Sequence, residues 1–292
     1  MKLIERQSII VSKIVAQIEA GGLDPWQCPW VKGAAFGFPI NAASRARYRG
    51  GNVIGLWAEA LHRGYTSPEW ATYVQWLKLG AQVRRGESAA WIIVYGTSDS
   101  DDDGEPRKRY LRAFPVFNAQ QVDGFDAAHT ATGCELVSHR HVDRFKRATG
   151  ARFVYGTDRA YYAPAQDMIF MPHRRAFANS DDYCATELHE LIHWTGAAHR
   201  LGRLDHVTTA EEYAREELVA ELGCAFLCAD LRVKPSPRAD HAAYLAHWLD
   251  AMKADPAYLF KVASLASRAA FYLASGGLAV EPVQLLLPDL AA

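Results

Sequence analysis

The segment His189-Glu190-Leu191-Ile192-His193 places two histidines and a glutamate in the spacing HExxH. On a helix, residues four apart share a face, so His189 and His193 can bind one metal ion. Glu190 then lies beside the ion and can act as general base toward an attacking water. The motif predicts a catalytic zinc site of the metallopeptidase type, which Mn²⁺ could also occupy.

A catalytic zinc site needs a third protein ligand. Residues 214–222 are predicted to form a helix on which Glu217 and Glu221 lie one turn apart, pointing the same way as apolar neighbours. Carboxylates in such a position need a buried partner. We expect Glu217 to bind the metal and Glu221 to accept a hydrogen bond from the non-ligating nitrogen of one histidine. Glu221 itself remains an alternative third ligand.

His199 is a second alternative, because it lies six residues after His193 and Gly196 completes the pattern HExxHxxGxxH. The residues after it, Arg200 to Arg203, and the acidic helix downstream favour a glutamate ligand instead. The remaining acids of that helix are expected on a solvated face: Glu211, Glu212 and Glu216.

Charge and tryptophan are unevenly distributed along the chain. The formal net charge is −1, but residues 1–98 carry 11 Lys and Arg against 6 Asp and Glu, and the remainder carries 21 against 27. Six of the eight tryptophans also lie within the first 91 residues. Single-stranded nucleic acid is bound by cations that contact phosphates and aromatic rings that stack on bases. This composition is compatible with an N-terminal half that binds a single-stranded nucleic acid.

The candidate DNA-binding residues combine both types of side chain, and they are Arg45, Arg47, Tyr48, Arg49, Trp70, Arg84 and Arg85. Other tryptophans, Trp57, Trp76 and Trp91, are expected in the core. The five cysteines form no disulfide framework, and Cys224 and Cys228 are expected to be buried as small apolar residues.

The pattern of elements predicts an α+β protein, in which a mixed α/β DNA-binding domain (1–126) precedes a mainly helical metallopeptidase domain with a small sheet (127–292). Residues 89–96 and 109–119 are strand-like and flank the acidic stretch 98–105, as in a hairpin. A helix is expected from Ser180, closed by Gly196 as a C′ glycine. The first residues do not resemble an export signal and no membrane span is expected, so the predicted location is cytoplasmic.

The C-terminal half resembles the zincin-like metallopeptidase domain of ArdC-type plasmid antirestriction proteins. The resemblance lies in YCATELHELIHWTG (183–196), HRLGR (199–203) and EELVAELGCAFL (216–227). The N-terminal half resembles the same family's N-terminal module, shared with some plasmid primases. It does so in PWQCPW (25–30), YRGGN (48–52), GYTSPEWATYVQWLKLGAQVRRGE (64–87) and VFNAQQV (116–122). Cys28 and Glu187 depart from the family pattern.

The resemblance implies a protein that binds single-stranded DNA and protects incoming DNA from restriction during conjugation. It also implies proteolysis of an unidentified protein substrate, with Glu217 as ligand and Glu221 behind a histidine. Two other readings stay open. The metal site could be non-proteolytic on a DNA-binding protein, or the chain could cleave a regulator that its N-terminal half binds as a protein.

Overall fold

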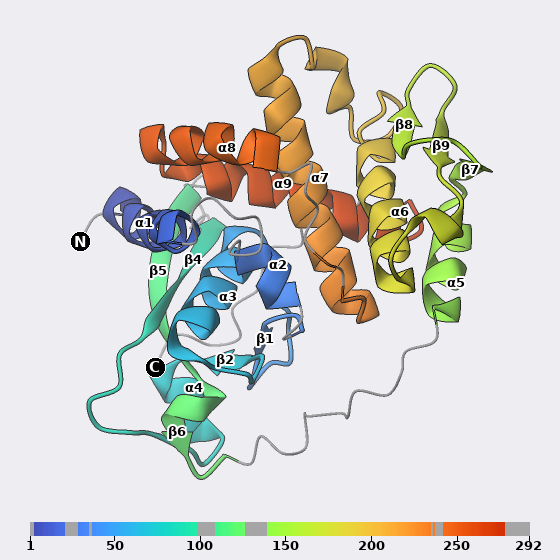
Figure 1. The fold of residues 1–292 in the computed structure, drawn as a ribbon. Coiled ribbons are helices and arrows are strands. Elements are labelled where there is room, and N and C mark those ends of the chain that lie inside the picture. Colours follow the sequence, from blue (N-terminus) through green and yellow to red (C-terminus); the bar gives the residue numbers. More distant parts are fainter. Residues whose placement is uncertain are drawn as a thin grey trace, which may run out of the picture.

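The computed structural model describes residues 3–20, 29–34, 37–97, 109–125, 139–234, 236 and 242–277. Within these residues helices combine with small, separate sheets, and the later part of the chain is mainly helical, which confirms the predicted α+β class (Figure 1). The predicted boundary at residue 126 and the acidic stretch 98–105 lie outside the described residues. No helix in the described ranges is long and apolar enough to cross a membrane.

The N-terminal half is built around a four-stranded sheet in the order β1-β2-β5-β4. Its strands are β1 (Ile40–Asn41), β2 (Glu69–Ala71), β4 (Ala90–Thr97) and β5 (Arg109–Asn118). β4 and β5 pair antiparallel from Ala90↔Val116 to Thr97↔Arg109, which confirms the predicted hairpin strands. A two-stranded sheet joins β3 (Gln82–Val83) to β6 (Val122–Asp123). The helices are α1 (Leu3–Ala20), α2 (Pro29–Ala34), α3 (Gly51–Arg63) and α4 (Tyr73–Lys78).

The C-terminal half is mainly helical. α5 (Arg140–Thr149) leads into a three-stranded sheet of order β7-β9-β8, formed by β7 (Arg152–Tyr155), β8 (Tyr161–Ala163) and β9 (Met168–Met171). Four helices follow: α6 (Ser180–Trp194), α7 (Ala210–Leu231), α8 (Ala242–Ala254) and α9 (Ala257–Ala274). α6 packs against the small sheet on one side and α7 on the other (Figure 1).

The two halves share one hydrophobic core. Phe226 of α7 meets the rings of Phe38 and Trp57 with centroid distances of 6.0 and 5.9 Å. At Gly51 of α3, an added Cβ would lie 2.2 Å from Phe260 of α9, so only glycine allows this approach. The core cluster accordingly runs from α1 to α9 without interruption. Of the three tryptophans expected in the core, Trp57 and Trp76 are buried, whereas Trp91 is only partly buried. Cys224 and Cys228 are buried as predicted.

Phe226→Ala tests the shared core, because it removes a ring that packs against both halves. We expect the free energy of unfolding to fall by about 3–5 kcal/mol. For this variant, tryptophan fluorescence and far-UV circular dichroism should still each show a single unfolding transition, and the two probes should give the same midpoint as each other. The control Ile9→Ala, at a 42% exposed position, should cost about 0.5 kcal/mol or less. Two separate transitions would show that the halves unfold independently.

Candidate metal centre

Local capping places the histidine-bearing helix. Asn179 caps α6, its Oδ1 accepting a hydrogen bond from the backbone N–H of Asp182 at 2.8 Å, so the helix begins at Ser180 as predicted. The prediction of a C′ glycine at Gly196 is wrong in its reason. This residue does not have positive φ. Glycine is needed for space, since a Cβ there would lie 2.9 Å from Leu204 Cγ.

The second helix of the site, α7, starts with a capping box. Thr209 Oγ1 accepts from the N–H of Glu212 at 3.2 Å, and Glu212 Oε2 accepts from the N–H of Thr209 at 3.0 Å. Further along, a Cβ at Gly223 would lie 2.8 Å from Ile192 Cδ1, so the glycine lets α7 approach α6 closely. This close packing brings the acidic side of α7 against the histidines.

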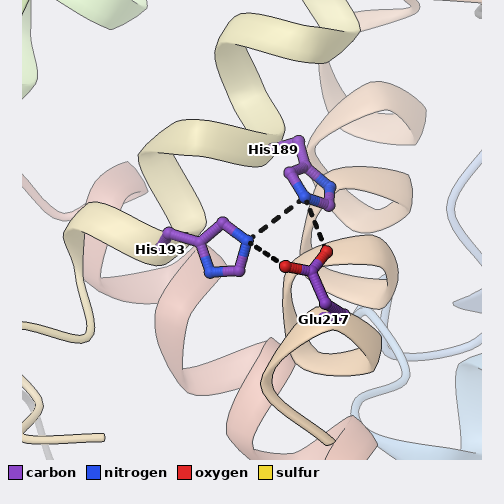
Figure 2. A group of neighbouring side chains, drawn as sticks. All are labelled: His189, His193 and Glu217. Atoms are coloured by element: carbon purple, nitrogen blue, oxygen red, sulfur yellow. Dashed lines mark hydrogen bonds and ion pairs between the residues drawn. The ribbon is translucent and has the colours of Figure 1, made fainter. Parts of the chain in front are cut away.

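His189, His193 and Glu217 meet between the two helices, with the imidazoles and the carboxylate pointing toward one another (Figure 2). The two Nε2 atoms are 3.2 Å apart, and each lies 3.5 Å from a different oxygen of Glu217. Tetrahedral zinc with bonds of about 2.0–2.1 Å spaces its ligand atoms about 3.3 Å apart. The three donors therefore already have the spacing of a metal site.

The charges around the site also fit a divalent cation. Glu190, Glu216, Glu217 and Glu221 are all less than a tenth exposed, and buried carboxylates need compensation. Burial opposes ionisation of Glu217, but the hydrogen bond with His189 and the charge of His193 lower its pKa to about 2. The group is a carboxylate at neutral pH, the form that binds metal.

Each histidine faces a second glutamate on its far side. His193 Nδ1 lies 3.3 Å from Glu216 Oε1, and Glu216 is held by Arg203, whose Nε and Nη2 donate to its two oxygens at 3.1 and 2.9 Å. The prediction that Glu216 lies on a solvated face is wrong, because Arg203 folds back from the loop to neutralise it. His189 Nδ1 lies 3.9 Å from Glu221, beyond hydrogen-bond distance but on the predicted side.

The anchoring of Arg203 explains why Glu216 can be buried. Its Nη2 also donates to the carbonyl of Ile192 at 2.8 Å, and its Nη1 donates to Thr195 Oγ1 at 2.9 Å. The guanidinium thus joins the end of α6 to α7. The sequence analysis did not predict the pair of Arg203 and Glu216. The available signal was that Glu216 is adjacent to the candidate ligand Glu217 and that Arg203 precedes the same helix.

The alternative ligand His199 is not part of the group. Its side chain is 63% exposed and its Nε2 lies 3.7 Å from Asp167 on the loop before β9. Arg200 Nη2 donates to both carboxylate oxygens of Asp167, at 2.7 and 2.6 Å. The Arg200 guanidinium lies 3.5 Å from the Trp194 ring centroid. His199 therefore lies outside the group formed by His189, His193 and Glu217.

Glu187, the departure on α6, is buried as half of an ion pair. Lys146 Nζ of α5 donates to its Oε1, and the hydroxyl of Tyr155 donates to the same oxygen at 3.3 Å. The pair attaches α5 and β7 to α6, the helix that carries the two histidines.

The structure corrects two of the predicted DNA-binding residues. Trp70 is 1% exposed and Tyr48 is 4% exposed, with the Tyr48 hydroxyl donating to the carbonyl of Trp70 at 3.3 Å. Neither ring can stack on a base, because both are buried in the core, with Trp70 on β2 itself. Their predicted role in DNA binding is wrong.

The predicted arginines differ in their surroundings. Arg45 forms an ion pair with Glu69, and Arg47 forms one with Asp230 of α7. Arg49 is exposed, its guanidinium 5.5 Å from the Phe271 ring. Arg84 pairs with Glu87 at 2.9 Å and donates to the carbonyl of Gln120.

Comparison with known proteins places this combination of modules. Family models match residues 5–122 as the N-terminal domain of the anti-restriction factor ArdC and residues 140–265 as a zincin-like metallopeptidase. The metal-free crystal structure of the antirestriction protein ArdC from plasmid R388 is 37% identical, with a TM-score of 0.80 over 93% of this chain and 97% of that one. The chain belongs to the ArdC family of antirestriction proteins.

Further relatives agree. The Mn(II)-bound structure of R388 ArdC is 35% identical, with a TM-score of 0.80 over 96% of this chain and 100% of that one. The protein y4eC of Sinorhizobium fredii is 38% identical over 90% of each chain. A DNA primase TraC of Escherichia coli is 36% identical over 89% of this chain, which spans only 26% of the primase. This ArdC-family protein thus has a zincin-like domain whose donors suit a divalent metal.

A graded series tests the site. Glu217→Ala should remove most of the affinity for Zn²⁺, because a direct ligand is lost. Glu216→Gln should weaken it about 10- to 100-fold by releasing His193. Glu211→Gln, on the exposed side of α7, is the matched control and should bind like the unchanged chain. Competition with a chromogenic chelator measures all three, and full affinity in Glu217→Ala would refute the ligand assignment.

Proposed function

We propose that this ArdC-family protein binds single-stranded DNA without sequence preference and hydrolyses a protein substrate at its metal centre, thereby protecting incoming DNA from restriction during conjugation. The observation that carries the proposal is the preformed group of His189, His193 and Glu217 with Glu190 buried on the same helix. A purely structural metal site has no need of Glu190. The site of action is the cytoplasm, where transferred DNA arrives.

In the proposed reaction, His189, His193 and Glu217 would hold a Zn²⁺ ion or, in its place, Mn²⁺. A bound divalent ion would supply Lewis-acid polarisation of the scissile carbonyl. Glu190 takes a proton from the attacking water and passes it to the leaving amine. Glu216 and Arg203 keep the His193 ring oriented, and Glu221 faces the ring of His189.

Glu190→Gln separates the chemistry from the binding functions. We expect protease activity on casein, and on the natural substrate once known, to fall by at least about 100-fold, as loss of a general base predicts. Zn²⁺ and single-stranded DNA should bind as before, since Glu190 is neither a proposed ligand nor near the proposed DNA contacts. If the variant still protects DNA in a conjugation assay, proteolysis is not the basis of antirestriction, and the non-proteolytic reading is favoured.

The corner between α4 and β3 offers the best surface for single-stranded DNA in the N-terminal half. A cavity of about 510 Å³ there is lined by Tyr73, Gln82, Val83, Arg84, Arg85, Glu87, Phe117 and Asp123. The Tyr73 ring is 43% exposed, and its hydroxyl accepts from Gln82 Nε2 at 3.0 Å. Arg85 is exposed, and no ion pair of the described residues engages it. Tyr73 supplies the stacking surface that Trp70 cannot.

Substitutions at this corner should change DNA affinity in two distinct ways. Tyr73→Leu should weaken binding of a single-stranded oligonucleotide by about 5- to 150-fold, the equivalent of about 1–3 kcal/mol per stacked base. Arg85→Ala should reduce the slope of log K against log salt by about 0.7, the effect of one phosphate contact. Fluorescence anisotropy of the full chain measures both, and Trp70→Phe is the buried control.

Other results at this corner would favour different readings. If single-stranded DNA binds with no salt dependence, or not at all, the DNA-binding proposal fails. The exposed side chains of Val74, Leu77 and Leu79 on and beside α4 would then favour the reading in which this half binds a protein.

A further inference from the structure

The small sheet of the metallopeptidase module has two different faces. Register places Phe153, Ile169 and Tyr162 side by side on one face, and Val154, Phe170 and Tyr161 side by side on the other. On the first face Ile169 and Tyr162 are buried, consistent with the packing of β8 and β9 on α6. On the second face Val154 is 36% and Tyr161 is 37% exposed. We call this second face the outer sheet face.

The outer sheet face carries an aromatic row with cations at its margins. The rings of Tyr161 and Phe170 are stacked, 4.9 Å apart and 9° from parallel. The Arg159 guanidinium lies 5.5 Å from the Tyr161 centroid. Arg152, next to the row on β7, is exposed and donates to the carbonyl of Gln166 at 2.7 Å. Neither arginine forms an ion pair with a carboxylate of the described residues.

The segment around this face is basic, although the C-terminal part of the chain as a whole is acidic. Residues 139–177 contain eight Lys and Arg and only three Asp and Glu. α5, which runs directly into β7, adds the exposed Arg144 and Arg147, again without carboxylate partners among the described residues. A surface of this charge attracts a polyanion, and the effect on binding depends on salt.

We propose that the outer sheet face is a second contact surface for single-stranded DNA, in which Arg152 and Arg159 bind phosphates and Tyr161 with Phe170 supports a base. The inference rests on the proposed DNA binding and adds a site on the module that carries the metal. An exposed aromatic row bordered by unpaired arginines is the combination used for unstacked bases and their phosphates. A duplex, whose bases are already stacked, has little use for the aromatic row.

The outer sheet face and the α4 corner are well separated in the structure. The outer sheet face lies beyond α6, far from α4 at the other end of the molecule (Figure 1). A strand that reaches both surfaces must therefore be longer than one that occupies the α4 corner alone. Oligonucleotide length thus becomes an experimental variable that separates the two contacts.

The test compares full-length variants with oligonucleotides of about 6 and about 40 nucleotides by fluorescence anisotropy over a range of salt. Arg152→Ala/Arg159→Ala should lower the salt slope for the long oligonucleotide by about 1.4, since each phosphate contact contributes about 0.7 on single strands. Tyr161→Leu should weaken binding of the long oligonucleotide by at least about 5-fold. The control Arg215→Ala/Arg268→Ala removes the same charge from exposed positions on α7 and α9 and should leave the slope unchanged.

Crosslinking gives a second readout that does not depend on a variant. A long oligonucleotide containing 5-iododeoxyuridine should attach to peptides from residues 159–171 on irradiation. The contradicting outcome requires that the unchanged chain binds the strand. If the double variant then keeps the full salt slope and these peptides remain unmodified, the outer sheet face is not a DNA contact. The α4 corner would in that case be the one DNA contact proposed. If the unchanged chain does not bind at all, the proposed function itself has failed. An equal loss of duplex binding would show a general electrostatic surface and overturn the assignment to single strands.

Discussion

The close packing of α7 on α6 is the constraint on which the metal centre depends. It places three carboxylates of α7, Glu216, Glu217 and Glu221, in an interface that also contains Glu190 of α6. Buried carboxylates are tolerated only when each has a partner. Arg203 neutralises Glu216, and the imidazoles of His189 and His193 lie against the other two acids of α7. The excess of negative charge that remains is what a divalent cation balances.

The same helix also joins the two modules. One side of α7 carries the metal-site glutamates, and Phe226 on a later turn packs against Phe38 and Trp57 of the N-terminal half. Arg47 reaches Asp230 near the end of the helix. The N-terminal module therefore packs directly on the helix that carries Glu217, and the position of this carboxylate depends on the integrity of the shared core.

Cations of this protein serve two purposes, and their partners distinguish them. Arg45, Arg47 and Arg203 are held by carboxylates and stabilise the fold. Arg85 and Arg159 are exposed without such partners in the described chain, and each lies beside an exposed aromatic ring. A net charge of −1 is thus compatible with exposed arginines beside aromatic rings at two surfaces, because several of the acidic residues are buried around the metal centre.

Patterns of short range could be predicted from the sequence alone. The spacing of His189, His193, Glu217 and Glu221 follows from helical periodicity, and the strands of the β4–β5 hairpin follow from runs of apolar residues. These features depend on near neighbours in the chain. The family resemblance added the order of the two modules.

The tertiary structure determined which side chains are buried and which ion-pair or hydrogen-bond partners they have. Glu216 was predicted to be a solvated acid, but it is buried and paired with Arg203, which lies thirteen residues away in sequence. His199 had the spacing of a ligand, but its side chain is exposed and lies near Asp167 instead. Trp70 looked like a stacking surface and is covered by the core, whereas Tyr73, three residues on, is exposed. The physical reason is the same in each case. Burial and charge compensation depend on partners that the fold brings together, and these partners cannot be predicted from residue type or local spacing.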